Sequence, residues 1–120
     1  METKHNLETF EELFKELNKT KFNNKLPNYK IEFKNMPSYF GRVWYNKKLI
    51  QLNPNYNYES IANTLLHELI HADFRRRGFN NTSHSVRFWR EFSDKGGVIT
   101  DINKSIFKKA KQVSDERNGR

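Results

Sequence analysis

The chain contains no cysteine, which excludes disulfide bonds, thiolate metal ligands and any cysteine-based zinc ribbon. It also has no apolar run close to the roughly 20 residues that a membrane-spanning helix requires. The N-terminal stretch METKHNLETFEELF lacks the apolar core of a signal peptide. From these absences we expect a soluble protein of a reducing intracellular compartment, with no membrane partner.

The residues that are present make a polar chain with a large supply of aromatic side chains. Hydrophobic residues account for 35% and charged residues for 30%, and the mean hydropathy is −0.98. Phe (10), Tyr (5) and Trp (2) compensate, because each large ring buries much apolar area. The length of 120 residues predicts a single domain over 1–120, with a core in 7–95 and a basic C-terminal helix and tail over 98–120.

Charge is distributed unevenly along the chain. The formal net charge is +8, yet residues 1–17 carry five glutamates against two lysines, so the remaining 103 residues carry +11. Such an excess favours a polyanionic partner, and nucleic acid is the leading candidate. The alternative is a solubilising surface that binds nothing.

Hydrophobic periodicity predicts an α+β fold with one small antiparallel or mixed sheet of three strands. Asn57 is a candidate N-cap for the longest helix, and Gly78 is its candidate stop. The expected elements are a helix over 6–20, strands over 29–34, 41–45 and 49–52, helices over 58–77 and 84–95, and a last helix that contains Ile102, Ile106, Phe107, Ala110 and Val113.

The central motif is His67-Glu68-Leu69-Ile70-His71. Two histidines one helical turn apart point in the same direction, so both imidazoles can bind one metal ion. Zinc suits them, since it prefers nitrogen ligands and keeps an open position for water in catalytic sites. Burying the Glu68 carboxylate within an apolar helix segment is costly unless a cation lies nearby. The pattern therefore predicts one Zn²⁺ per chain in a hydrolase, most simply a peptidase.

The third ligand is sought downstream of His71. His84 follows after twelve residues, enough for the helix to end and a loop to return, and we favour it. Acidic ligands remain possible, with Glu91 and Asp94 available.

In the expected mechanism zinc acidifies its bound water and polarises the scissile carbonyl, while Glu68 acts as the base and is not a ligand. No residue is assigned to stabilise the oxyanion; Tyr45, Tyr56 and Tyr58 are available. The substrate could add a strand to the sheet edge beside the active helix. Either 49–52 or 42–45 could be that edge.

The arrangement as a whole resembles the SprT-like metallopeptidase domain found in the SprT and Spartan proteins, and the match covers roughly residues 7–95. The ordered set around the central motif carries the resemblance. It comprises Leu17-Asn18-Lys19-Thr20-Lys21-Phe22, Asn24-Lys25-Leu26-Pro27, the strand-opening Gly41, Ile50-Gln51-Leu52-Asn53-Pro54, Thr64-Leu65-Leu66-His67-Glu68-Leu69-Ile70-His71-Ala72 and His84-Ser85-Val86-Arg87-Phe88.

The resemblance implies a zincin-like fold in which His67, His71 and His84 bind zinc and Glu68 is catalytic. Spartan-like members cleave proteins bound or crosslinked to DNA, so it also implies a protein substrate and non-specific DNA as partners. Ser85 departs from the glycine usual in the family, and the cysteine zinc ribbon of many relatives is missing. We expect a minimal monomeric member in the cytoplasm of a bacterial or phage-infected cell, associated with the nucleoid if it binds DNA.

Basic residues flank the predicted zinc ligands and are candidates for phosphate contacts. Those at 75–77 could instead complement the helix dipole, and the aromatic side chains of Phe88, Trp89 and Phe92 are expected in the core. Two other functions stay open: a DNA-binding or adaptor module with a restrained site, and a zincin that cleaves one dedicated regulator. The candidate DNA-binding residues are Arg75, Arg76, Arg77, Arg87, Arg90, Lys104, Lys108, Lys109 and Lys111.

Overall fold

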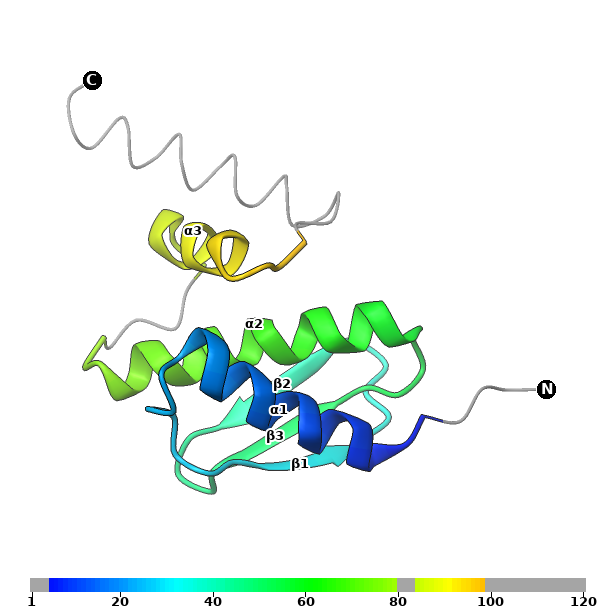
Figure 1. Cartoon of the computed structure of the whole chain (residues 1–120). Coiled ribbons are helices and arrows are strands. Elements are labelled where there is room, and N and C mark those ends of the chain that lie inside the picture. The colour runs from blue at the N-terminus through cyan, green and yellow to red at the C-terminus, as the bar shows by residue number, and fades with distance from the viewer. Residues whose placement is uncertain (1–4, 80–83, 99–120) are drawn as a thin grey trace.

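The computed structural model describes residues 5–79 and 84–98, and it has the α+β architecture that the sequence predicts (Figure 1). Within these ranges the chain forms three helices and one mixed sheet of three strands. The predicted last helix, including Lys104, Lys108, Lys109 and Lys111, lies outside the described residues. The elements are α1 (Leu7–Lys21), β1 (Lys30–Phe33), β2 (Gly41–Trp44), β3 (Leu49–Leu52), α2 (Tyr58–Arg76) and α3 (Val86–Asp94).

Asparagine side chains begin the two longer helices. The Asn6 side chain accepts a hydrogen bond from the backbone N–H of Glu8 at 2.9 Å, and Asn57 accepts one from Ser60 at 2.8 Å. Each satisfies a helix N–H that would otherwise lack a partner. Helix α2 ends just before Gly78. This glycine has a φ of +89°, which a residue with a side chain adopts only under strain.

The strand order in the sheet is β1-β3-β2, with β1 parallel and β2 antiparallel to β3. A turn that ends at Lys48, with φ of +51°, joins β2 to β3 as a hairpin. Because β3 is central, the segment 49–52 cannot be the edge that receives a substrate strand. Strand β2 is the edge that contacts α2.

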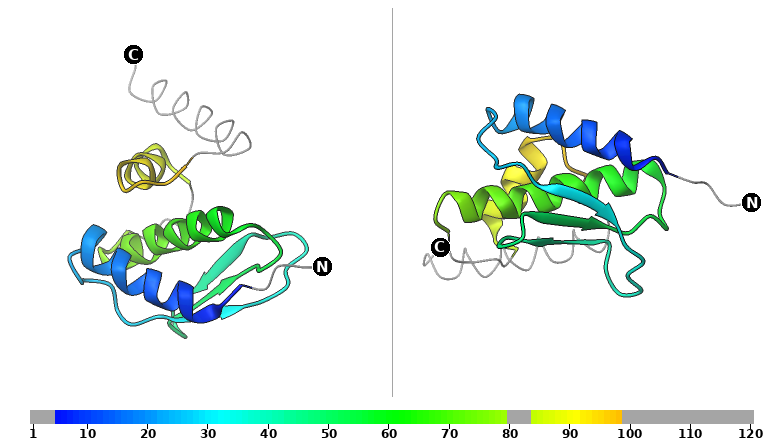
Figure 2. Two further views of the ribbon diagram at one scale, coloured as in Figure 1. Left: turned by 45° about the vertical axis from the view of Figure 1, so that its right-hand side comes forward. Right: turned by 90° about the horizontal axis from the view of Figure 1, so that it is seen from below.

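Helices α1 and α2 pack on one face of the sheet, and α3 packs on α2 on the side away from the sheet (Figure 2). Ile31, Ile50 and Leu52 point from the strands into the core between helices and sheet, and each is at most 2% exposed. The aromatic side chains of α3 fill the space between α3 and α2, which confirms the prediction that they are core residues. Phe88, Trp89 and Phe92 are all 0% exposed.

A glycine lets the edge strand approach the long helix closely. A Cβ atom at Gly41 would lie 2.7 Å from Cγ2 of Thr64 on α2 and 2.9 Å from the backbone oxygen of Gln51 on β3. No larger residue fits there without moving β2 or α2. The strand therefore lies directly beside the helix that carries the histidine motif.

One local feature differs from expectation. Helix α3 begins at Val86 with Ser85 as its N-cap, so His84 precedes the helix and does not open it. Near the N-terminus, His5 contacts the backbone oxygen of Tyr56 through Nε2 at 2.7 Å. Over residues 5–79 and 84–98, no helix is both long enough and apolar enough to cross a membrane.

Candidate metal centre

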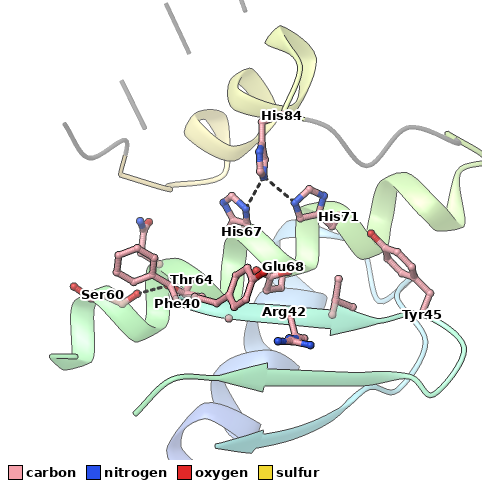
Figure 3. Close-up of a pocket in the computed structure, with 13 residues that line it drawn as sticks. Phe40, Arg42, Tyr45, Ser60, Thr64, His67, Glu68, His71 and His84 are labelled. Atoms are coloured by element: carbon pink, nitrogen blue, oxygen red, sulfur yellow. Dashed lines mark hydrogen bonds between the residues drawn. The ribbon is translucent and has the colours of Figure 1, made fainter. Parts of the chain in front are cut away.

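Helix α2 positions two histidines on the side that faces α3. Apolar neighbours anchor this part of the helix, since Leu65, Leu69 and Ile70 are each 0% exposed. His67 and His71 are one turn apart and their ring centroids lie 5.0 Å from each other. Figure 3 shows both imidazoles directed away from the sheet, toward the segment that precedes α3.

His84 completes a cluster of three imidazoles. Its Nε2 atom lies 3.0 Å from Nε2 of His67 and 3.2 Å from Nε2 of His71. With zinc–nitrogen bonds of about 2.05 Å at tetrahedral angles, neighbouring ligand nitrogens lie about 3.3 Å apart. Both distances from His84 are thus close to the spacing that one small cation imposes, and the ligand atoms of all three histidines lie within 4.8 Å of one another. The described residues contain no other cluster of this kind.

The surroundings of the cluster keep the imidazoles neutral. Burial and the two neighbouring histidines lower the pKa of His67 to about 3, and burial together with His84 lowers that of His71 to about 4. Burial also lowers the pKa of His84. The ring of Phe88 packs against all three, at centroid distances of 4.4–5.0 Å. At neutral pH each ring therefore offers a free lone pair, as a metal ligand must.

Glu68 lies between the two helical histidines in sequence but outside the cluster of ligand atoms. Its side chain extends between α2 and β2 (Figure 3). The residue is only 6% exposed, and burial raises the pKa of its carboxyl to about 8. A carboxyl so placed ionises at neutral pH only with a cation nearby. Its position suits a proton-accepting group better than a ligand.

An ion-pair network holds α3, and with it His84, against α2. Asp73 is 4% exposed and accepts hydrogen bonds from Arg76 at 2.8 Å and Arg77 at 2.9 Å. Arg77 also donates to Glu91 of α3 at 2.9 Å. Glu91, considered as a third ligand, is thereby engaged in fixing α3, and neither it nor Asp94 belongs to the metal cluster.

A cleft of about 660 Å³ opens between β2 and α2 in front of the histidines (Figure 3). The sequence predicted the histidines and Glu68 that line the cleft, but not most of the other residues around it. The strand-opening Gly41 was the available signal, because a strand that begins with a close approach to the active helix contributes its neighbours to the site. The lining residues for which the sequence indicated no role in the site are Tyr39, Phe40, Arg42, Val43, Ser60, Asn63 and Thr64.

The structure separates the three tyrosines considered for oxyanion stabilisation. Tyr45 lines the cleft, and Figure 3 shows its hydroxyl directed toward α2 near His71. Tyr58 stacks on Phe10 at 5.4 Å instead, and Tyr56 packs on Phe40; neither lines the cleft. Burial first, and then the Glu68 carboxylate, raises the pKa of Tyr45, so the phenol remains a hydrogen-bond donor.

The arginines predicted to contact DNA have varied surroundings. Arg76 and Arg77 are engaged by Asp73 and Glu91, as described above. The guanidinium of Arg75 lies 5.0 Å from the centre of the Tyr45 ring, and that of Arg87 lies 4.8 Å from the Phe79 ring. Arg90 is exposed. Of these five arginines, Arg76 and Arg77 thus already have carboxylate partners in the fold.

Comparisons with known proteins agree with this geometry. The model of the SprT-like family matches residues 10–110. A metallopeptidase zymogen from Pyrococcus abyssi, abylysin, is 25% identical in sequence with a TM-score of 0.56, covering 72% of this chain and 77% of its own. A zymogen from Methanocaldococcus jannaschii, jannalysin, is 21% identical with a TM-score of 0.52, covering 93% of this chain and 98% of its own. No curated protein matches the chain.

Proposed function

The chain belongs to the SprT-like family and is a metallopeptidase, and from that premise we propose that it is a zinc endopeptidase whose single ion is held by His67, His71 and His84. The observation that carries the proposal is the convergence of three neutral imidazoles beside a buried glutamate, with Nε2 of His84 3.0 Å from that of His67 and 3.2 Å from that of His71. The donor set is all nitrogen, which suits zinc and leaves the fourth position for water or substrate.

Zinc in this site supplies Lewis acidity, which acidifies water and polarises the scissile carbonyl. Glu68 performs the proton transfers. Once a bound cation lets this buried carboxyl ionise, its place between helix and strand fits a group that accepts a proton from the attacking water and later gives it to the leaving amine.

Tyr45 is the proposed hydrogen-bond donor to the developing oxyanion. Its hydroxyl reaches the cleft from the strand side, opposite the helix that carries Glu68. Its ring is held by Arg75, whose guanidinium lies 5.0 Å from the ring centre. Donors fixed before the reaction stabilise charge at no cost of reorganisation.

The peptide substrate is proposed to lie along β2. Among the described strands β2 pairs only with β3, so its other side offers backbone N–H and C=O groups to an extended peptide. Gly41 keeps β2 against α2, so a peptide paired with the strand would pass the histidines at the distance set by the cleft. Hydrogen bonds between the main chains of β2 and the peptide would supply affinity that depends little on the peptide sequence.

Proteins bound to DNA are the proposed substrates. The net charge of +8, with +11 outside residues 1–17, supports binding of a polyanion. Electrostatic attraction to DNA would concentrate the enzyme where such substrates are found.

The direct test combines metal analysis with a cleavage assay. The purified protein should contain about one zinc per chain and cleave casein or histone. Glu68→Gln should retain zinc but lose at least the roughly 10²–10⁴-fold that a general base contributes. Full activity in this variant would remove Glu68 from the mechanism, and a protein without zinc or another tightly bound metal would refute the proposed site.

A further inference from the structure

One face of the sheet is open. Helices α1 and α2 cover the face that carries Ile31 and Ile50, and within residues 5–79 and 84–98 no helix packs on the other face. Side chains alternate across a strand, so Arg42 and Trp44 of β2 project from this open face. Figure 3 shows the Arg42 guanidinium on the side of β2 remote from the three imidazoles.

Exposed rings and cations alternate along this part of the chain. The Arg42 guanidinium lies 5.1 Å from the centre of the Tyr39 ring and 5.4 Å from that of Trp44, and the Lys47 ammonium lies 5.1 Å from Trp44. Tyr39 is 57% exposed and Trp44 is 39% exposed. Neither Arg42 nor Lys47 forms a salt bridge with any described carboxylate. We call Tyr39, Arg42, Trp44 and Lys47 the aromatic–basic strip.

The indole of the strip is oriented by a hydrogen-bond chain across all three strands. Trp44 Nε1 donates to Gln51 Oε1 at 3.0 Å, and Gln51 Nε2 donates to Glu32 Oε2 at 2.7 Å. Gln51 is 8% exposed and sits on the central strand, so this anchor is itself held in place. An exposed tryptophan fixed in this way loses little conformational entropy when a ligand stacks on it.

We propose that the aromatic–basic strip binds single-stranded nucleic acid, with bases stacked on Trp44 and Tyr39 and phosphates beside Arg42 and Lys47. A single strand repeats a flat base and a phosphate, and the strip repeats a ring and a cation. An acidic peptide would match the cations but would leave the two rings in water. Exposed cation–π contacts are weak, so a base can replace them at small cost.

The strip meets the cleft at β2, because Tyr39 and Arg42 also line it. A nucleic-acid strand held there would run past the mouth of the cleft, and a protein attached to that strand would be delivered to the histidines. This consequence rests on the proposed peptidase. The binding itself does not, and its test requires no cleavage.

Intrinsic fluorescence gives a direct measurement, because the two tryptophans differ in access. Trp89 is 0% exposed and cannot stack on a ligand, whereas Trp44 is 39% exposed. Titration of the full chain with an oligothymidylate of about 12 nucleotides should quench the Trp44 emission. A duplex of equal length should bind more weakly, since paired bases are not free to stack.

Variants localise the binding. Trp44→Phe should remove the quenching but keep most of the affinity measured by anisotropy, because phenylalanine still stacks. Trp44→Ala and Tyr39→Ala should each weaken binding roughly 5- to 150-fold, the range of one base–aromatic stack. Lys47→Glu should weaken binding and flatten its salt dependence, whereas the charge-matched control Lys25→Glu, on an exposed turn, should not.

Three results would overturn the proposal. One is binding of duplex and single strand with equal affinity and no change in Trp44 emission. Another is equal loss of affinity in Lys47→Glu and Lys25→Glu, which would mean general electrostatics. The third is preferential quenching by an acidic peptide such as oligoglutamate, which would assign the strip to protein substrates. Zinc content and the Glu68→Gln variant decide the peptidase separately.

Discussion

Replacing Glu68 by glutamine should stabilise the metal-free protein, and by an amount that depends on pH. Burial raises the pKa of the Glu68 carboxyl from 4.5 to about 8 in the folded chain. Its folded pKa is above its unfolded value, so its contribution is most favourable below pH 4.5 and is lost as pH rises toward 8. Ionisation then costs the folded state on the order of 4 kcal/mol at pH 8, but about 1 kcal/mol at pH 5.

Glutamine has nearly the same shape and never ionises, so it avoids this cost. Urea unfolding in the presence of a chelator should show similar midpoints for the two proteins at pH 5. At pH 8 the Gln variant should unfold at a midpoint roughly 2 M higher, taking an m-value of about 2 kcal/mol/M. The lowered pKa values of the three histidines affect both proteins equally, so they cancel in the comparison.

Zinc supplies the internal control. A dication beside the site stabilises the carboxylate, so saturating zinc should reduce the advantage of the Gln variant at pH 8. If the midpoint difference were the same at pH 5 and pH 8, the carboxyl would not be buried in the way described. A wild-type protein more stable than the variant at pH 8 without metal would contradict the reasoning outright.

Three further changes test the site. His84→Ala should lose stoichiometric zinc by metal analysis while His5→Ala keeps it; full zinc in the former would require another third ligand. Tyr45→Phe should lower kcat by a factor on the order of 10² with little change in KM or zinc content, and an unchanged kcat would exclude the phenol as oxyanion donor. Gly41→Ala should cost about 1–3 kcal/mol by urea unfolding through overpacking against Thr64, and a neutral effect would show that β2 can move freely.

Local sequence patterns sufficed for the helices and strands. The apolar spacing from Leu7 onward predicted α1, and the candidate cap Asn57 with the stop at Gly78 predicted α2, each to within a residue or two. The alternation in 29–34 and the segment 49–52 likewise corresponded to β1 and β3. These signals are carried by neighbours in sequence, and so they can be read without knowing the fold.

The parts that could not be predicted depend on contacts between distant segments. Nothing local to 49–52 says that it pairs with two strands and is therefore central, so the edge role of β2 stayed open. The ion pair between Arg77 and Glu91 could not be predicted without knowing how α3 packs on α2. Charge counts alone had suggested the arginines at 75–77 for DNA, whereas the strip at Trp44 emerged only when the open face of the sheet was known.

The packing of α3 has a consequence for how the molecule opens. Among the described helices and strands, α3 packs only against α2. It is therefore a candidate for sub-global unfolding as a separate cooperative unit. A cation bound by His67 and His71 of α2 and by His84, which precedes α3, would link the two helices as a crosslink does and oppose this local unfolding. Chelation should accordingly accelerate hydrogen exchange at the amides of α3 while those of the sheet stay protected.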